Sequence, residues 1–84
     1  MYYVYIIANH KGSLYIGHTK NLKQRIKQHN QGQVKFTSFG VPWVLVYREE
    51  KDTKELALKR ELQIKKWSRK KKISLIKHGH PTKF

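Results

Sequence analysis

Residues 2–17 read YYVYIIANHKGSLYIG, and this stretch decides the fold. Residues 2–8 are almost all β-branched or aromatic, which is typical of a strand covered on both faces. A polar, glycine-containing turn follows, and residues 14–17 return as a second strand, so the stretch predicts an antiparallel hairpin. Beyond the hairpin, the pattern predicts helices over 21–29, 54–67 and 68–79, with Asn21, Thr53 and Ser68 as their N-caps. It also predicts a loop over 30–42 and a third strand over 43–47. We therefore expect one α/β domain over residues 1–84, with a core of about 2–76 and a short basic tail at 77–84.

The charge of the chain is extreme. Lysine and arginine number 19 against five acidic residues, so the net charge is +14. A polyanion relieves such self-repulsion, and nucleic acid and anionic membranes are the usual partners. No apolar run approaches the roughly 18 residues needed to span a bilayer, so we expect nucleic acid and no membrane. The chain has no cysteine for a disulfide or thiolate zinc site, and its uncharged start lacks a secretory leader, which favours a cytoplasmic location.

Two tyrosines of the hairpin are candidates for chemistry. Tyr5 and Tyr15 share a face of the sheet if the hairpin pairs residues of like parity. Both phenols could simply belong to the core, or one of them could orient or deprotonate an attacking water. Gly17 follows directly and permits close approach of a ligand to the backbone.

Arg25 and His29 lie four residues apart on the inner stripe of the first helix. An arginine there is suited to bind a phosphate through two oxygens, and a histidine one turn later can hold water or a leaving oxygen. The alternative is an arginine–carboxylate ion pair beside a solvated histidine.

Glu61 falls inside the apolar arc of its helix. That arc is formed by Ala57, Leu58 and Ile64. Desolvating an unpaired carboxylate is costly, so Glu61 needs Arg25, Lys65 or a metal ion as its partner. A single carboxylate completed by water and phosphate suits Mg²⁺, which would polarise a phosphodiester; the alternative is an Arg25–Glu61 bridge between two helices.

Taken in order, these residues resemble the GIY-YIG nuclease family, especially its small stand-alone bacterial branch. The likeness covers residues 2 to about 76 and rests on the following set: Tyr3-Val4-Tyr5, Tyr15-Ile16-Gly17, Arg25, His29 and Glu61. It implies an α+β fold in which helices flank a three-stranded antiparallel sheet. Two departures are Tyr3, where the family motif opens with glycine, and His18, where several members carry lysine.

The resemblance also implies roles for the candidate residues. Tyr5 would position or activate water, Tyr15 would be the general base, and His29 would assist proton transfer. Arg25 would stabilise the phosphate, and Glu61 would bind one Mg²⁺ or Mn²⁺ ion, with no small-molecule cofactor. Five further residues are expected to contact the substrate: Gly17, His18, Lys20, Lys35 and Lys65.

We therefore expect a metal-dependent endonuclease that hydrolyses DNA with low sequence specificity, because phosphate-binding groups are plentiful and base-reading groups are few. A preference for a flap, branch or nick is one option, RNA is not excluded as substrate, and a protein partner could supply specificity. The second hypothesis is a non-catalytic nucleic-acid-binding module that keeps the fold. A third is a small adaptor that binds an acidic protein.

Overall fold

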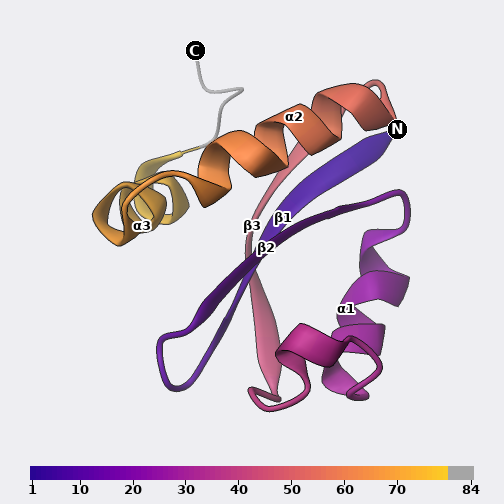
Figure 1. Ribbon diagram of the computed structural model, residues 1–84, viewed down its shortest axis with the longest axis vertical. Helices are drawn as coiled ribbons and strands as arrows, with labels where there is room; N and C mark the ends of the chain where they lie inside the picture. The colour runs from indigo at the N-terminus through magenta and orange to yellow at the C-terminus, as the bar shows by residue number, and fades with distance from the viewer. Residues whose placement is uncertain (80–84) are drawn as a thin grey trace.

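The computed structural model describes residues 1–79, which form one three-stranded antiparallel sheet with helices on both sides. The strands are β1 (Tyr2–Asn9), β2 (Leu14–Thr19) and β3 (Trp43–Lys51), in the spatial order β2-β1-β3. The helices are α1 (Leu22–Asn30), the short 3₁₀ helix η1 (Lys35–Thr37), α2 (Lys54–Lys65) and α3 (Arg69–His78). Figure 1 shows α1 and η1 on one side of the sheet and α2 with α3 on the other. The predicted α+β architecture is confirmed.

Several element boundaries differ from those predicted. The third strand continues to Lys51 rather than ending at residue 47, and α2 ends at Lys65 rather than at residue 67. Residues 80–84, the end of the predicted tail, lie outside the described part of the chain. None of the helices within residues 1–79 is long and apolar enough to cross a membrane.

The three predicted helix N-caps are confirmed. The side chains of Asn21, Thr53 and Ser68 each accept a hydrogen bond from the backbone N–H three residues later. Each such cap satisfies one of the free amide groups at the start of a helix and is worth about 1 kcal/mol. The local sequence therefore fixes where each helix begins.

Alternation along β1 divides the core into two halves. Tyr5 and Ile7 face α1 and pack with Trp43, whereas Val4 and Ile6 face α2 and α3. These four central side chains of β1 are fully buried because the strand lies between two others and is covered on both faces. The chemistry predicted for Tyr5 therefore has to take place on the α1 side of the sheet.

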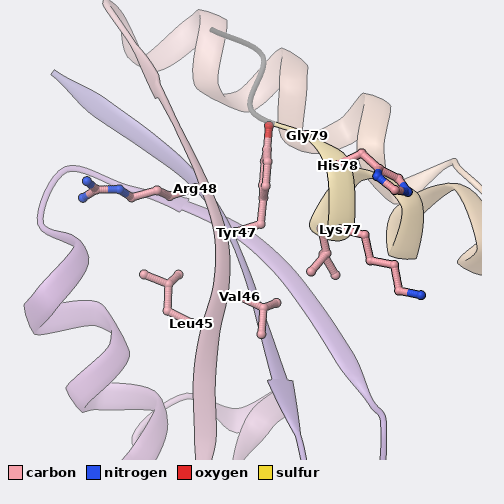
Figure 2. Close-up of a pocket in the computed structure, with 8 residues that line it drawn as sticks. Leu45, Val46, Tyr47, Arg48, Lys77, His78 and Gly79 are labelled. Atoms are coloured by element: carbon pink, nitrogen blue, oxygen red, sulfur yellow. The ribbon is translucent and has the colours of Figure 1, made fainter. Parts of the chain in front are cut away.

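A β-bulge interrupts the pairing of β1 with β3. Ile6 pairs with Tyr47 and Ile7 with Leu45, so Val46 is an extra residue on β3. The bulge reverses which residues face which side. Figure 2 shows Leu45 and Arg48 leaving β3 on the side of α1, whereas Val46 and Tyr47 leave it towards α3. A pocket of about 380 Å³ lies between this part of β3 and the end of α3.

Beyond the bulge, Glu49 ties β3 to α2. Its side chain is 2% exposed and accepts hydrogen bonds from the Tyr47 hydroxyl at 2.6 Å and from Arg60 Nε at 3.0 Å. Lys51 Nζ lies 3.2 Å away. Burial alone would raise the pKa of Glu49, but the Tyr47 hydroxyl and the charges of Arg60 and Lys51 outweigh it and hold this pKa below its usual value. Glu49 is therefore a charged, fully partnered structural residue.

Candidate active site

Three rings gather on the α1 side of the sheet. The register pairs Tyr5 with Gly17 and Ile7 with Tyr15, so residues of like parity face each other and the two tyrosines share a face, as predicted. Their ring centroids lie 6.4 Å apart. The ring of His29, on α1, lies 5.7 Å from Tyr5 and 5.0 Å from Tyr15. The hairpin and the first helix thus bring three predicted site residues into one cluster.

A chain of hydrogen bonds runs through His29. Its Nε2 lies 2.7 Å from the Tyr5 hydroxyl and its Nδ1 lies 2.7 Å from Thr37 Oγ1. The Thr37 hydroxyl donates to the carbonyl of Val34 at 3.2 Å. Because that proton is committed to the carbonyl, Thr37 accepts from Nδ1–H and leaves Nε2 to accept from the Tyr5 O–H. Thr37 therefore fixes the tautomer of His29.

Burial sets the protonation states of this pair. It raises the pKa of Tyr5 to about 12, with the Arg25 guanidinium opposing the shift. It also lowers the pKa of His29 to about 4, and here the charge of Arg25 acts in the same direction. At neutral pH the phenol is consequently protonated and the imidazole is neutral. Both states agree with a hydrogen bond donated by Tyr5 to His29.

Gly17 lies directly against the Tyr5 ring. A Cβ built on Gly17 would lie 2.6 Å from the Tyr5 hydroxyl oxygen, 2.8 Å from its Cζ and 3.2 Å from Tyr15 Cε2. The absence of a side chain at this position is therefore required by the two phenols. The predicted contact of Gly17 with substrate stays a prediction.

Glu61 is buried on α2, close to the edge strand β2. It is 7% exposed, and its two oxygens meet His18 Nδ1 and Lys65 Nζ, the latter at 2.6 Å. Arg25 instead donates to Gln28 at 3.2 Å, so these contacts contradict the Arg25–Glu61 bridge considered as an alternative. Glu61 approaches the sheet from the α2 side, and its charge is the smallest of the causes that shift the pKa of Tyr5.

The expected apolar arc of α2 is confirmed except at one residue. Ala57 and Ile64 are fully buried with Glu61, but Leu58 is 41% exposed and lies outside the arc. The prediction for Leu58 was wrong because α2 covers the sheet with a narrower stripe than the wheel suggested. Glu61 is thus buried although Leu58, an apolar neighbour on the same helix, is exposed.

The donor set suits a loosely held divalent ion. Within residues 1–79 no group of three or more His, Cys, Asp or Glu side chains could form a complete protein cage. Mg²⁺ keeps most of its water and commonly binds through one or two carboxylates together with substrate phosphates. Glu61 fits that pattern, provided that an oxygen now held by His18 or Lys65 becomes available.

The remaining predicted contacts lie at the margin of the cluster. Lys20 Nζ lies 5.9 Å from the centre of the Tyr2 ring and borders a depression of about 570 Å³ with Arg48. Lys35 is exposed at the start of η1. Sequence reasoning missed Arg48, which pairs with Tyr5 across the sheet on the α1 side. Arg48 follows the bulge at Val46, where the alternation of β3 changes phase, so the sequence gives no sign of that placement.

Known proteins match the chain over nearly its whole length. A family model described as the GIY-YIG catalytic domain matches residues 1–74. A UPF0213 protein of Staphylococcus saprophyticus is 49% identical over 79 residues, which cover 93% of this chain and 96% of that protein. A UPF0213 protein of Staphylococcus aureus is 47% identical over 77 residues, covering 90% and 94%. The solution NMR structure of a UPF0213 protein from Bacillus halodurans is similar with a TM-score of 0.59 and 38% identity, covering 92% of this chain and 84% of that one.

Proposed function

The chain belongs to the GIY-YIG family of nuclease domains, and on that premise we propose that it is a metal-dependent endonuclease that hydrolyses DNA with little sequence preference. The observation that carries the proposal is the buried Tyr5–His29 hydrogen bond beside the charge of Arg25. Burying the polar groups of Tyr5, His29 and Thr37 together costs stability, and such arrangements concentrate at sites of chemistry. A module that only binds phosphates needs exposed cations, not this cluster.

We assign the two phenols different tasks because their surroundings differ. Tyr5 is 1% exposed and donates its proton to His29, so its oxygen is left to accept a hydrogen bond from an attacking water. Tyr15 is only partly buried and lies against the same imidazole. We assign it the role of general base, in which its phenolate, after loss of the phenolic proton to solvent, would take up the proton of the attacking water. His29 is neutral and able to receive the proton of Tyr5. Arg25 offsets the charge that develops on the phosphate.

Glu61 would hold the divalent ion, Mg²⁺ or Mn²⁺, which would polarise the phosphodiester and offset its added negative charge. Lys65 and His18 balance the carboxylate when no ion is bound. Both are then free to contact the phosphate backbone once an oxygen of Glu61 is engaged. The substrate itself completes the site, which agrees with a single protein carboxylate.

Low sequence specificity follows from the kind of side chain that the chain offers. A net charge of +14 favours phosphate contacts, which give affinity and salt dependence on any sequence. One observation favours the rival function, a non-catalytic nucleic-acid-binding module: both oxygens of Glu61 are already partnered by His18 and Lys65. A carboxylate satisfied in this way needs no metal.

Cleavage assays with a matched pair of variants decide between the two. Supercoiled plasmid and branched DNA are incubated with the protein in Mg²⁺, in Mn²⁺ and in EDTA. Glu61→Ala should abolish cleavage and leave DNA binding nearly intact, whereas Glu55→Ala, which removes an exposed carboxylate from the first turn of the same helix, should cleave normally. Tight binding without any metal-dependent product would establish the binding module instead.

A further inference from the structure

The segment between α1 and β3 presents two phenylalanines to solvent. Phe36 is 83% exposed and Phe39 is 92% exposed. The chain has three phenylalanines, and a domain of 84 residues has a thin core that large aromatic side chains would ordinarily fill. Neither residue contributes to either half of the core. Burial in the core therefore does not explain why phenylalanine stands at these two positions, and we look for a binding role instead.

The segment that carries them is firmly anchored. Trp43 Nε1 donates to the carbonyl of Thr37 at 2.8 Å, and Asn9 Nδ2 donates to the carbonyl of Gly40 at 3.1 Å. Asn30 and Trp43 exchange two further hydrogen bonds, of 3.0 and 2.6 Å. Between the two phenylalanines, Thr37 is 1% exposed and points inward. The hydrogen bonds therefore anchor the backbone that carries Phe36 and Phe39, and we call this pair the aromatic platform.

The aromatic platform adjoins the candidate active site. Thr37 lies within it in sequence and is hydrogen bonded to His29, which in turn is hydrogen bonded to Tyr5. Figure 1 shows η1 beside α1, on the side of the sheet where the three rings gather. Lys35, immediately before Phe36, adds an exposed cation. A nucleic-acid strand held at the cluster would thus meet a cation and two aromatic faces.

We propose that Phe36 and Phe39 stack on unpaired bases next to the phosphate that is cleaved, so that the substrate is DNA with a single-stranded flap or overhang. This inference rests on the proposed function and names its substrate class. Aromatic side chains next to cations are the usual means of holding single strands, and they accept any base because every base has a π face. Bases inside a duplex are stacked on one another and are not available.

A protein partner fits the aromatic platform less well. A stable protein–protein interface buries about 800 Å² on each side, whereas two phenylalanines supply on the order of 400 Å². The segment carries one cation, Lys35, and no acidic residue, and the net charge of the chain is +14, which suits a polyanion of any sequence. Nucleic acid therefore accounts for both the aromatic and the basic character of the segment.

Binding in EDTA tests the platform without requiring cleavage. Fluorescence anisotropy would compare a flap substrate and a blunt duplex for the wild type and for three double variants, in which Phe36 and Phe39 are both replaced by Ala, by Leu or by Trp. The Ala and Leu variants should lose about tenfold or more in affinity for the flap, and the Trp variant should retain it, because Leu keeps an apolar side chain but removes the π face. Affinity for the blunt duplex should change by less than about twofold.

Leu62→Ala, which truncates a half-exposed apolar side chain on α2, serves as the matched control and should bind as the wild type does. Circular dichroism checks that every variant is folded. The platform is refuted if the wild type shows no preference for the flap, if the Ala variant binds both substrates equally weakly, or if sedimentation shows that the substitutions abolish self-association and leave DNA binding unchanged. A wild type that prefers flaps through these residues yet never cleaves would refute the proposed function and keep the platform.

Discussion

The hydroxyl of Tyr5 lies 2.7 Å from Nε2 of His29, although the two residues are 24 positions apart and belong to different elements. The bond joins the central strand to α1 across the interior, and both groups are fully buried. Since an unpaired polar group there would be costly, each residue requires the other. The pair is therefore a structural link as well as the centre of the proposed chemistry.

Thr37 should control the tautomer of His29. Thr37→Val keeps the shape of the side chain but removes the acceptor for Nδ1–H, so we expect a loss of about 1–3 kcal/mol in the free energy of unfolding. Thr37→Ser keeps the hydroxyl and should stay close to the wild type. Urea titration gives the stabilities, and ¹⁵N chemical shifts of the imidazole report the tautomer. A Thr37→Val protein with an unchanged stability and spectrum would contradict the assignment.

Gly17→Ala should damage both the fold and the site. The new methyl group would lie 2.6 Å from the Tyr5 hydroxyl oxygen, and the buried ring has no room to move away. We expect a loss of about 1–3 kcal/mol, typical of overpacking, together with loss of cleavage. Adding Tyr5→Phe removes the hydroxyl but leaves Cζ at 2.8 Å, so stability should recover only in part. Equal urea midpoints for Gly17→Ala and the wild type would contradict this prediction, because they would mean that the backbone of the sheet shifts to make room for the methyl group.

The protonation of His29 should make the protein sensitive to acid. Its pKa falls from 6.5 in the unfolded chain to about 4 in the folded protein, because burial and Arg25 disfavour the charged ring. Between these values the unfolded chain binds more protons, so the free energy of unfolding falls as the pH falls. The full contribution is present above the unfolded pKa, and about 2 kcal/mol should be lost by about pH 5.

Urea titrations of the wild type and of His29→Gln at about pH 7 and about pH 5 measure this effect. The variant is less stable at both values, but its stability should depend less on pH. Parallel pH dependences in the two proteins would assign the acid sensitivity to another group.

Glu49→Ala should destabilise the protein without touching the site. The substitution leaves the Tyr47 hydroxyl and the Arg60 guanidinium without their shared partner. We expect a loss of roughly 2–4 kcal/mol, below the full value for a buried pair because Arg60 and Lys51 remain partly exposed. Glu50→Ala, at the exposed neighbouring position, should change stability by less than about 0.5 kcal/mol. Thermal denaturation of the Glu49→Ala and Glu50→Ala variants measures both effects. Similar losses of stability in the two variants would contradict the structural role of Glu49.

Local patterns were enough to predict the hairpin, the helix N-caps and the shared face of Tyr5 and Tyr15. Each of these depends on neighbours in the sequence: alternation along a strand, a turn of fixed length, or a side chain three residues from an amide. The inward stripe of α1 is of the same kind, because helical periodicity alone places Arg25 and His29 together. Burial of Glu61 followed from the same argument on α2.

Relationships that depend on packing between distant segments could not be predicted. The role of Thr37 requires the loop after α1 to return against His29, and no periodicity encodes that return. Glu49 was overlooked because the predicted third strand ended at residue 47, whereas β3 continues to Lys51. The alternation of β3 also changes phase at Val46, so an odd-and-even rule would assign the second half of the strand to the wrong face. Leu58 was placed inside the arc of α2 because a helical wheel cannot show how wide a stripe the sheet covers.

The extra residue at Val46 also constrains the length of β3. Before it, odd-numbered positions such as Leu45 face α1, and after it odd-numbered positions such as Tyr47 and Glu49 face α2 and α3. Deleting one residue here would turn the second half of the strand over. The carboxylate of Glu49 would then enter the cluster of Tyr5 and Arg25, and Arg48 would enter the apolar core. During evolution single residues of this strand can be substituted one at a time. Deletion of one codon at the bulge instead moves every side chain in the second half of the strand to the opposite face of the sheet.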